Sequence, residues 1–193
     1  MMSQTNILAP NTLAAASAYR LVKSAALIVG ASIFMALCAH VSIPLVFSPV
    51  PITLQPFGVL LIGMLMGSRA GSAALVLYLL EGAAGMPVFS PAGPGGILQL
   101  MGPTGGFLMA SPLAAFLAGK VFESRKNMSG ALLGSMAAEI ALFTIGAAWF
   151  IAVMRVGFAQ AFIMAVLPYI PGEVLKVAAA SAIATRWASQ QRG

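Results

Sequence analysis

The sequence predicts an all-α integral membrane protein, a bundle of six transmembrane helices with both termini in the cytoplasm. Of the 193 residues, 60% are hydrophobic and only 7% are charged, and the mean hydropathy is +0.98. A soluble domain carries roughly 25% charged residues, so this chain lacks the charges that a water-facing surface needs. Its length allows about six helices of about 20 residues with their connections.

Composition also excludes several classes of function. The single cysteine, Cys38, excludes an internal disulfide and any metal site built from several cysteines. The chain has no His-Glu-x-x-His motif, no Walker sequence, and one histidine only. The formal charge of +6 follows from the Lys and Arg that membrane proteins collect at their cytoplasmic ends. We therefore expect no metal, no cofactor, no catalytic residue and no nucleic-acid partner.

The N-terminal segment does not resemble a cleavable signal peptide, because its first 18 residues are polar and alanine-rich without any charge. We expect residues 1–23 to form a flexible cytoplasmic tail. A single transmembrane domain is predicted for residues 24–188, and residues 189–193 are predicted to be a short C-terminal tail.

Six apolar runs follow one another along the predicted domain. The first, 24–47, predicts a retained transmembrane helix. The second, 56–66, is short for a bilayer, and an earlier start lies in "PLVFSPVPITLQ", whose prolines set a bend outside the hydrocarbon or in a protein-lined cavity. The remaining runs are 70–84, 106–122, 130–154 and 159–188, the last interrupted by Pro168 and Pro171.

The placement of Lys and Arg sets the orientation, because positive residues favour the cytoplasmic side. With the N-terminus inside, the outer loops hold only Arg155, and Lys176 lies within the last run. The inner segments hold eight: Arg20, Lys23, Arg69, Lys120, Arg125, Lys126, Arg186 and Arg192. This bias predicts six spans across the cell membrane, with the lipid bilayer as the protein's surroundings.

The longest segment predicted to be non-helical, "GMPVFSPAGPGGILQLMGPTGGF" at 85–107, falls outside the membrane between the third and fourth spans. Its glycines, Gly105 among them, let backbone N–H groups approach a ligand closely. Gln99 and Thr104 add polar side chains. An irregular connection between two helices explains the same composition equally well.

A carboxylate and an ammonium, Glu173 and Lys176, stand three residues apart at the head of the last run. This spacing puts them on one helix face about one turn apart, and the preceding "PG" indicates that the helix starts there, with Glu173 in its first turn. Charges within a membrane usually pair or face a cavity. The two groups either form a self-sufficient ion pair, with the lysine reaching toward the interface, or form the polar end of a ligand pocket.

Other polar residues within the runs have no role fixed by the sequence. Glu139 lies near the middle of the fifth span and is protonated, paired across helices or directed at a ligand, whereas Glu81 lies near the outer end of the third. His40 is more typical of a hydrogen-bonded interface residue than of a ligand contact. Ser32 and Ala36 have the four-residue spacing of small side chains that lets helices approach within a membrane.

In order along the chain, "TLQPFGVLL", "YLLEGAAGMPVF", "GPTGGF" and "PYIPGEVLKV" form a specific signature. The segment from Arg20 to Arg186 that contains them resembles the BioY family, the biotin-binding membrane subunits (S components) of energy-coupling factor (ECF) transporters. The resemblance implies six transmembrane helices with cytoplasmic termini and biotin bound near the outer face. It also implies two kinds of partner, a membrane coupling (T) subunit and cytoplasmic ATPases.

Matched onto the motifs, the resemblance implies that Glu173 and Lys176 bind the ureido ring of biotin, with Gln55 from "T-x-Q" beside them. The ureido ring offers two N–H donors and one carbonyl acceptor, which a carboxylate and an ammonium complement. The family usually has Asp where this chain has Glu173, which is a methylene longer. The other expected substrate-binding residues are Tyr78, Phe89, Gln99, Thr104, Gly105 and Tyr169.

No arginine lies in the long outer loop, so glycine N–H groups, Lys176 or Arg155 are the candidates for the biotin carboxylate. Ser32 and Ala36 are the candidates for docking the coupling subunit. We expect a subunit that captures biotin at the outer face and passes it inward with an ATP-driven module. The alternatives are an S component for another vitamin, a biotin carrier that works without ATPases, and, less favoured, an intramembrane enzyme that uses Glu139 or Glu173.

Overall fold

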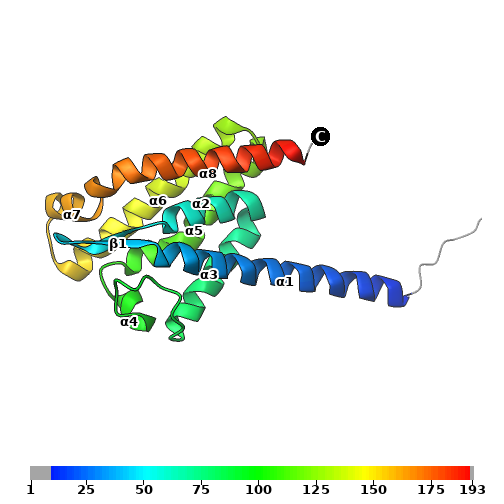
Figure 1. Ribbon diagram of the computed structural model, residues 1–193, viewed down its shortest axis with the longest axis horizontal. Helices are drawn as coiled ribbons and strands as arrows, with labels where there is room; N and C mark the ends of the chain where they lie inside the picture. Colours follow the sequence, from blue (N-terminus) through cyan, green and yellow to red (C-terminus); the bar gives the residue numbers. More distant parts are fainter. Residues whose placement is uncertain (1–9, 192–193) are drawn as a thin grey trace, which may run out of the picture.

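The structure, a computed structural model, describes residues 10–191, with side chains from residue 18 onward. Within that range the chain forms helices and one β-hairpin (Figure 1). The elements are α1 (Pro10–His40), β1 (Ser42–Leu45), β2 (Ser48–Thr53), α2 (Gln55–Met66), α3 (Ser68–Ala83), α4 (Gly96–Met101), α5 (Gly105–Arg125), α6 (Met128–Met154), α7 (Phe158–Ala165), the 3-10 helix η1 (Leu167–Tyr169) and α8 (Ile170–Gln190).

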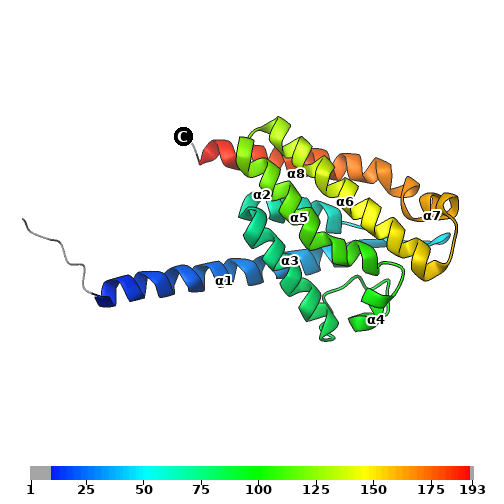
Figure 2. The ribbon, with the colours of Figure 1, turned by 180° about the vertical axis from the view of Figure 1, so that it is seen from behind.

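The helices form a bundle whose two ends differ. The N-terminal part of α1 and the C-terminal end of α8 point toward the same end in both views (Figures 1 and 2). The connection between β1 and β2, together with α4 and α7, lies at the opposite end, which we call the hairpin end. An even number of membrane crossings gives this arrangement of the termini.

The β-hairpin replaces the last part of the first predicted span. α1 ends at His40 and not near residue 47, and β1 and β2 pair antiparallel with Ser42 opposite Thr53. The prolines in this segment cannot continue a helix, because they lack the N–H that the helical ladder requires. A two-stranded sheet accepts them because both of its strands are edges. The prediction of a bend outside the second span was therefore correct in place, while the predicted end of the first span was wrong.

Prolines also divide the last predicted span. α7 and α8 are separated by η1, with Pro168 in η1 and Pro171 in the first turn of α8. Glu173 lies in the first turn of α8, as predicted. The prediction of a non-helical segment at 85–107 was wrong at two places. Residues 96–101 form the short helix α4, because they contain no proline and no run of β-branched residues, and residues 105–107 already belong to α5.

Glycines let α2 and α5 pack at close range. A Cβ on Gly63 of α2 would lie 2.3 Å from the carbonyl oxygen of Ala115 on α5, and one on Gly119 of α5 would lie 2.5 Å from the carbonyl oxygen of Gly63. Both distances are shorter than van der Waals contact, so only glycine allows this approach. Small residues at helix crossings are typical of packing within membranes.

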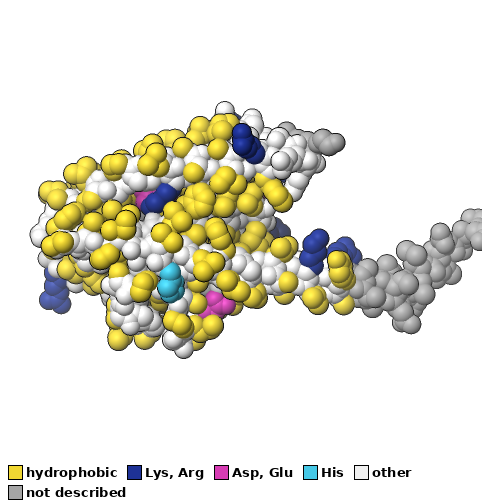
Figure 3. Space-filling model, in the orientation of Figure 1, with side chains coloured by type: hydrophobic (Ala, Val, Ile, Leu, Met, Phe, Trp, Pro, Cys, Tyr) yellow, Lys and Arg dark blue, Asp and Glu magenta, His cyan; other side chains and the backbone are white. Residues whose placement is uncertain are grey.

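Four helical stretches within the described residues are long and apolar enough to cross a membrane: Ala18–His40, Gly105–Arg125, Met128–Met154 and Phe158–Gln190. α2 and α3, with 12 and 16 residues, are shorter, so the structure leaves the count of six spans as a prediction. Hydrophobic side chains cover most of the visible face of the bundle (Figure 3). A multi-pass membrane protein is the class that these features predict.

The predicted tails are shorter than expected where the structure describes them. Residues 10–23 belong to α1, since they continue its helix without a break, and residues 189–190 belong to α8. The rest of the two predicted tails, apart from residue 191, lies outside the described residues.

Candidate ligand-binding site

A cavity of about 730 Å³, its open mouth included, lies toward the hairpin end of the bundle. β2, α2, α5, α6 and the start of α8 supply most of its walls, and the segment that contains α4 supplies a further part. α1, α7 and η1 each contribute one residue. The lining residues are Met35, Val50, Pro51, Thr53, Gln55, Pro56, Val59, Ser90, Gln99, Thr104, Phe107, Leu108, Ser111, Glu139, Leu142, Phe143, Ala165, Tyr169 and Glu173.

Gln55, the first residue of α2, is held by hydrogen bonds on both ends of its amide. Its Nε2 donates to the Tyr78 hydroxyl at 3.0 Å, and its Oε1 accepts from Thr53 Oγ1 at 3.2 Å. Tyr78 is fully buried behind this wall. The two bonds fix which face of the amide meets the cavity.

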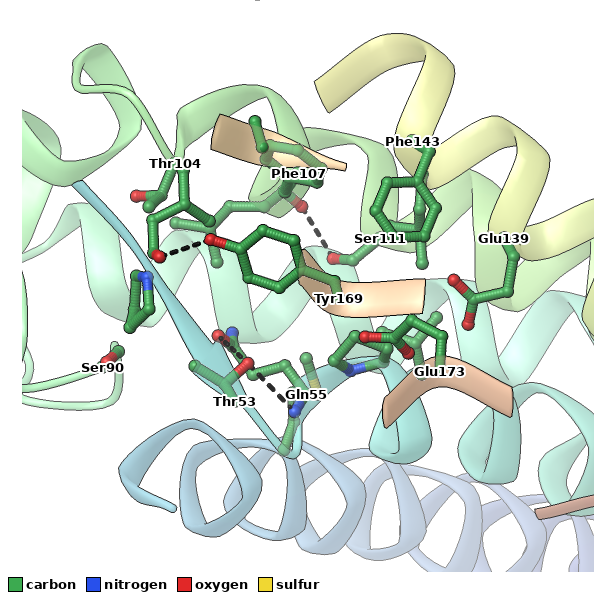
Figure 4. Close-up of a pocket in the computed structure, with 18 of the residues that line it drawn as sticks. Thr53, Gln55, Ser90, Thr104, Phe107, Ser111, Glu139, Phe143, Tyr169 and Glu173 are labelled. Atoms are coloured by element: carbon green, nitrogen blue, oxygen red, sulfur yellow. Dashed lines mark hydrogen bonds between the residues drawn. The ribbon is translucent and has the colours of Figure 1, made fainter. Parts of the chain in front are cut away.

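Tyr169, at the junction of η1 and α8, connects the hairpin to the last helix. Its hydroxyl donates to the carbonyl oxygen of Val50 at 2.5 Å and lies 3.3 Å from Ser48 Oγ, both on β2. The ring lies in the middle of the cavity wall (Figure 4). This tyrosine therefore positions β2 over the cavity as well as lining it.

Glu173 and Lys176 form an ion pair in which Lys176 Nζ donates to Glu173 Oε1 at 2.8 Å. Their side chains are 8% and 11% exposed, respectively. Glu173 lines the cavity, whereas Lys176 does not. Oε2 of Glu173 is buried and has no hydrogen-bond partner among the described residues, so half of this carboxylate is available to a ligand.

Glu139 on α6 lines the same cavity, although no definite role was predicted for it. Its carboxyl group and that of Glu173 lie near each other at one side of the cavity (Figure 4). Both oxygens of Glu139 are buried without a partner among the described residues. An acidic residue in the middle of an apolar run marked Glu139 as unusual, but the sequence alone does not show which side of the helix faces the cavity.

The opposite side of the cavity carries neutral polar groups. Ser90 and Thr104 lie across the cavity from the two carboxyl groups (Figure 4). Gln99 of α4 is buried, and its Oε1 accepts from the backbone N–H of Gly95 at 3.1 Å. Its amide NH₂ group takes no part in that bond. Between the two sides lie the aromatic rings of Phe107 and Tyr169 together with the polar side chains of Gln55 and Ser111 (Figure 4).

The structure places several predicted site residues behind the cavity wall. Phe89 packs its ring edge against Tyr78 at a centroid distance of 5.3 Å and covers Gly82, so neither aromatic lines the cavity. Gly105 lies in the first turn of α5, where a Cβ would meet the carbonyl oxygen of Leu100. These residues support the lining without forming it.

The two residues proposed for docking a partner differ in position. Ser32 is fully buried, and its hydroxyl donates to Glu81 of α3. Ala36 is partly buried and packs against the core. Docking of a partner at this pair stays a prediction, and Ser32 makes no exposed surface in this structure.

Comparison with known proteins identifies the family of this chain. The model of the BioY family matches residues 5–192. The chain belongs to the BioY family. The "Probable biotin transporter BioY" of Pyrococcus horikoshii is 39% identical over 138 residues, which are 72% of this chain and 80% of that protein. The "Biotin transporter BioY" of Rhizobium etli is 34% identical over 160 residues, 78% of this chain and 84% of the relative.

A solved structure has the same fold. It is described as the S component for biotin from an ECF-type ABC transporter, and it superposes with a TM-score of 0.79 at 27% identity, covering 88% of this chain and 92% of its own. Together with the four apolar helices, this match and the transporter relatives make the chain a multi-pass membrane protein of the BioY family.

Proposed function

We propose that this BioY chain is the biotin-binding membrane subunit of an ECF transporter. It captures biotin in the cavity at the hairpin end and passes it inward with a membrane coupling subunit and cytoplasmic ATPases. The proposal assigns no catalytic residue to the chain. It includes six spans, with α2 and α3 as two shorter crossings, in a cell membrane whose cytoplasmic side faces the described chain ends.

One observation carries the proposal, namely that two carboxyl groups lie at one side of the cavity and the hydroxyl groups of Ser90 and Thr104 lie across it, with the aromatic rings of Phe107 and Tyr169 between (Figure 4). Biotin has the same division, with a ureido ring at one end, a carboxylate at the other and apolar carbon and sulfur atoms between. The ureido ring matches the side that holds Glu173, because its N–H groups are donors and the free Oε2 is an acceptor.

The carboxylate of biotin then lies at the side with Ser90, Gln99 and Thr104. Lys176 is paired with Glu173 and does not line the cavity. Arg155 is exposed at the C-terminal cap of α6 and does not line it either. Hydroxyl and amide donors therefore bind the carboxylate in place of an arginine. Backbone N–H groups of the same outer loop are further donors for it.

The first test is a titration of the detergent-purified chain with biotin and with an analogue whose ureido group is altered. We expect saturable biotin binding that the altered analogue loses. Glu173→Ala and Lys176→Ala are each expected to weaken biotin binding at least tenfold, because a polar group of a dry site is left unpaired, at about 1–3 kcal/mol or more for a charge.

Glu81→Gln is the matched control, since Glu81 is an acid bonded to Ser32 between α1 and α3 and does not line the cavity. It should bind biotin as the unchanged chain does. A folded chain that does not bind biotin would contradict the proposal and move the search to other vitamins. Turnover of biotin into a product would favour an enzyme instead.

A further inference from the structure

Glu139 is the acid of the cavity that the family signature leaves without a role. It projects from the middle of α6, and both of its oxygens are buried without a partner among the described residues. Glu139, Phe143 and Glu173 also line an apolar groove between α6 and α8, on the other side of the same wall. The carboxyl group of Glu139 therefore lies between the cavity and the apolar groove.

The donors near this side of the cavity are already used. The hydroxyl groups of Thr53, Ser111 and Tyr169 donate to Gln55 Oε1, to the carbonyl oxygen of Leu108 and to that of Val50. The ammonium of Lys176 donates to Glu173 Oε1. A buried carboxyl group without hydrogen bonds costs free energy. A ligand that brings N–H donors supplies what these side chains do not.

We propose that Glu139 is a second ligand-binding carboxyl group. It accepts a hydrogen bond from one N–H of a cyclic urea while Glu173 Oε2 accepts from the other. The inference rests on the proposed function and extends it. The two carboxyl groups come from different helices and lie near each other at one side of the cavity (Figure 4), and the two N–H groups of a cyclic urea flank its carbonyl.

This arrangement makes Glu139 a specificity-determining residue. A site built to pair with a donor rejects an analogue that lacks it, because its acceptor is then left unpaired. The chain should therefore distinguish biotin from each of two lactam analogues, in which one or the other ring N–H is replaced by CH₂ at nearly constant size.

The experiment measures binding of biotin and both lactams to the full chain in detergent, for the unchanged protein, Glu139→Met and Thr144→Val. Thr144 is an exposed residue on the same helix, so its variant controls for loss of a polar side chain from α6. We expect Glu139→Met to weaken biotin binding at least tenfold. The same variant should leave unchanged the affinity for the lactam that lacks the N–H facing Glu139, and should still weaken binding of the other lactam.

Unchanged biotin affinity in Glu139→Met overturns the inference, and so does an equal loss for biotin and both lactams, which would indicate a structural role. If Glu139→Met does not fold, the unchanged protein still decides: either lactam binding as tightly as biotin shows that one N–H has no acceptor. Absence of biotin binding by the unchanged protein overturns the proposed function as well, so the two failures are distinguishable.

Discussion

Replacing Lys176 with methionine is expected to destabilise the protein strongly. The substitution keeps the length of the side chain and removes the cation that, among the residues the structure describes, is bonded to Glu173, at 2.8 Å and with both side chains about nine-tenths buried. Removing one partner of a buried ion pair costs about 3–5 kcal/mol, because the remaining charge is left without compensation. Here the remaining charge also lies near a second carboxyl group, that of Glu139, at the same side of the cavity (Figure 4).

Thermal unfolding in detergent measures the effect. With about 2–4 °C for each kcal/mol in a chain of this size, the unfolding midpoint should fall by roughly 6–20 °C. The double variant Glu173→Gln/Lys176→Met removes both charges, so it should recover most of the stability. It should not recover biotin affinity, because the carboxylate acceptor is gone. Stability and binding thus respond differently to the same pair of residues.

Lys120→Met is the control, because Lys120 is an exposed lysine near the C-terminal end of α5. Its midpoint should remain within a few degrees of that of the unchanged chain, as surface substitutions are usually within about 0.5 kcal/mol. A midpoint that is unchanged in Lys176→Met would refute the reasoning. A double variant no more stable than the single one would do the same, since the charge left behind would not be the cause.

Three further outcomes test the supports of the cavity. Tyr169→Phe removes the hydroxyl that donates to the hairpin carbonyl of Val50. The carbonyl left without its donor costs about 1–3 kcal/mol, so radiolabelled biotin should be released about fivefold faster or more in a chase experiment. An unchanged release rate would show that this bond to the hairpin does not control ligand release. Trp149→Phe removes the Nε1 bond to the carbonyl oxygen of Gly102, at 2.9 Å, and should increase hydrogen exchange in residues 93–104, an effect absent if packing alone holds that loop. Glu123→Ala removes the acceptor for the Ser68 backbone N–H, at 2.7 Å, at the start of α3. The lost cap should lower the free energy of unfolding by about 0.5–2 kcal/mol, measured by thermal unfolding, while biotin affinity stays the same. Weaker biotin binding would contradict a purely structural role of Glu123.

Much of the fold followed from the sequence because apolar runs and prolines act locally. The runs at 106–122 and 130–154 correspond to α5 and α6, and the prolines at 168 and 171 divide the last run as expected. The hairpin did not follow, because the apolar residues after His40 suit a strand as well as a helix. Pro44 and the local pairing of β1 with Ser48–Thr53 decide for the strand, and hydropathy alone registers neither.

The candidate site was predictable to the extent that it rests on motif residues. Gln55 and Glu173, to which the family signature assigns contacts with the substrate, line the cavity, and their contact with biotin stays a prediction. Tyr78 and Phe89 come from the same signature but lie behind the wall, since a motif marks a position in the chain and not its side of a helix. The orientation of Glu139 depends on how α6 packs against α8. The sequence of α6 alone does not determine that packing, because the helix is mostly apolar all round apart from this acid.

The brevity of α2 has a consequence for transport distance. The helix starts at Gln55 in the cavity wall and ends at Met66 after 12 residues, a length of about 18 Å at about 1.5 Å per residue. The hydrocarbon core of a bilayer is about 30 Å thick. Under the proposed function, with α2 as one of the shorter crossings, this helix covers less than two thirds of the hydrocarbon thickness. A molecule bound beside Gln55 would then lie below the outer surface of the bilayer, and the coupling module would have to move it over a distance shorter than a full crossing.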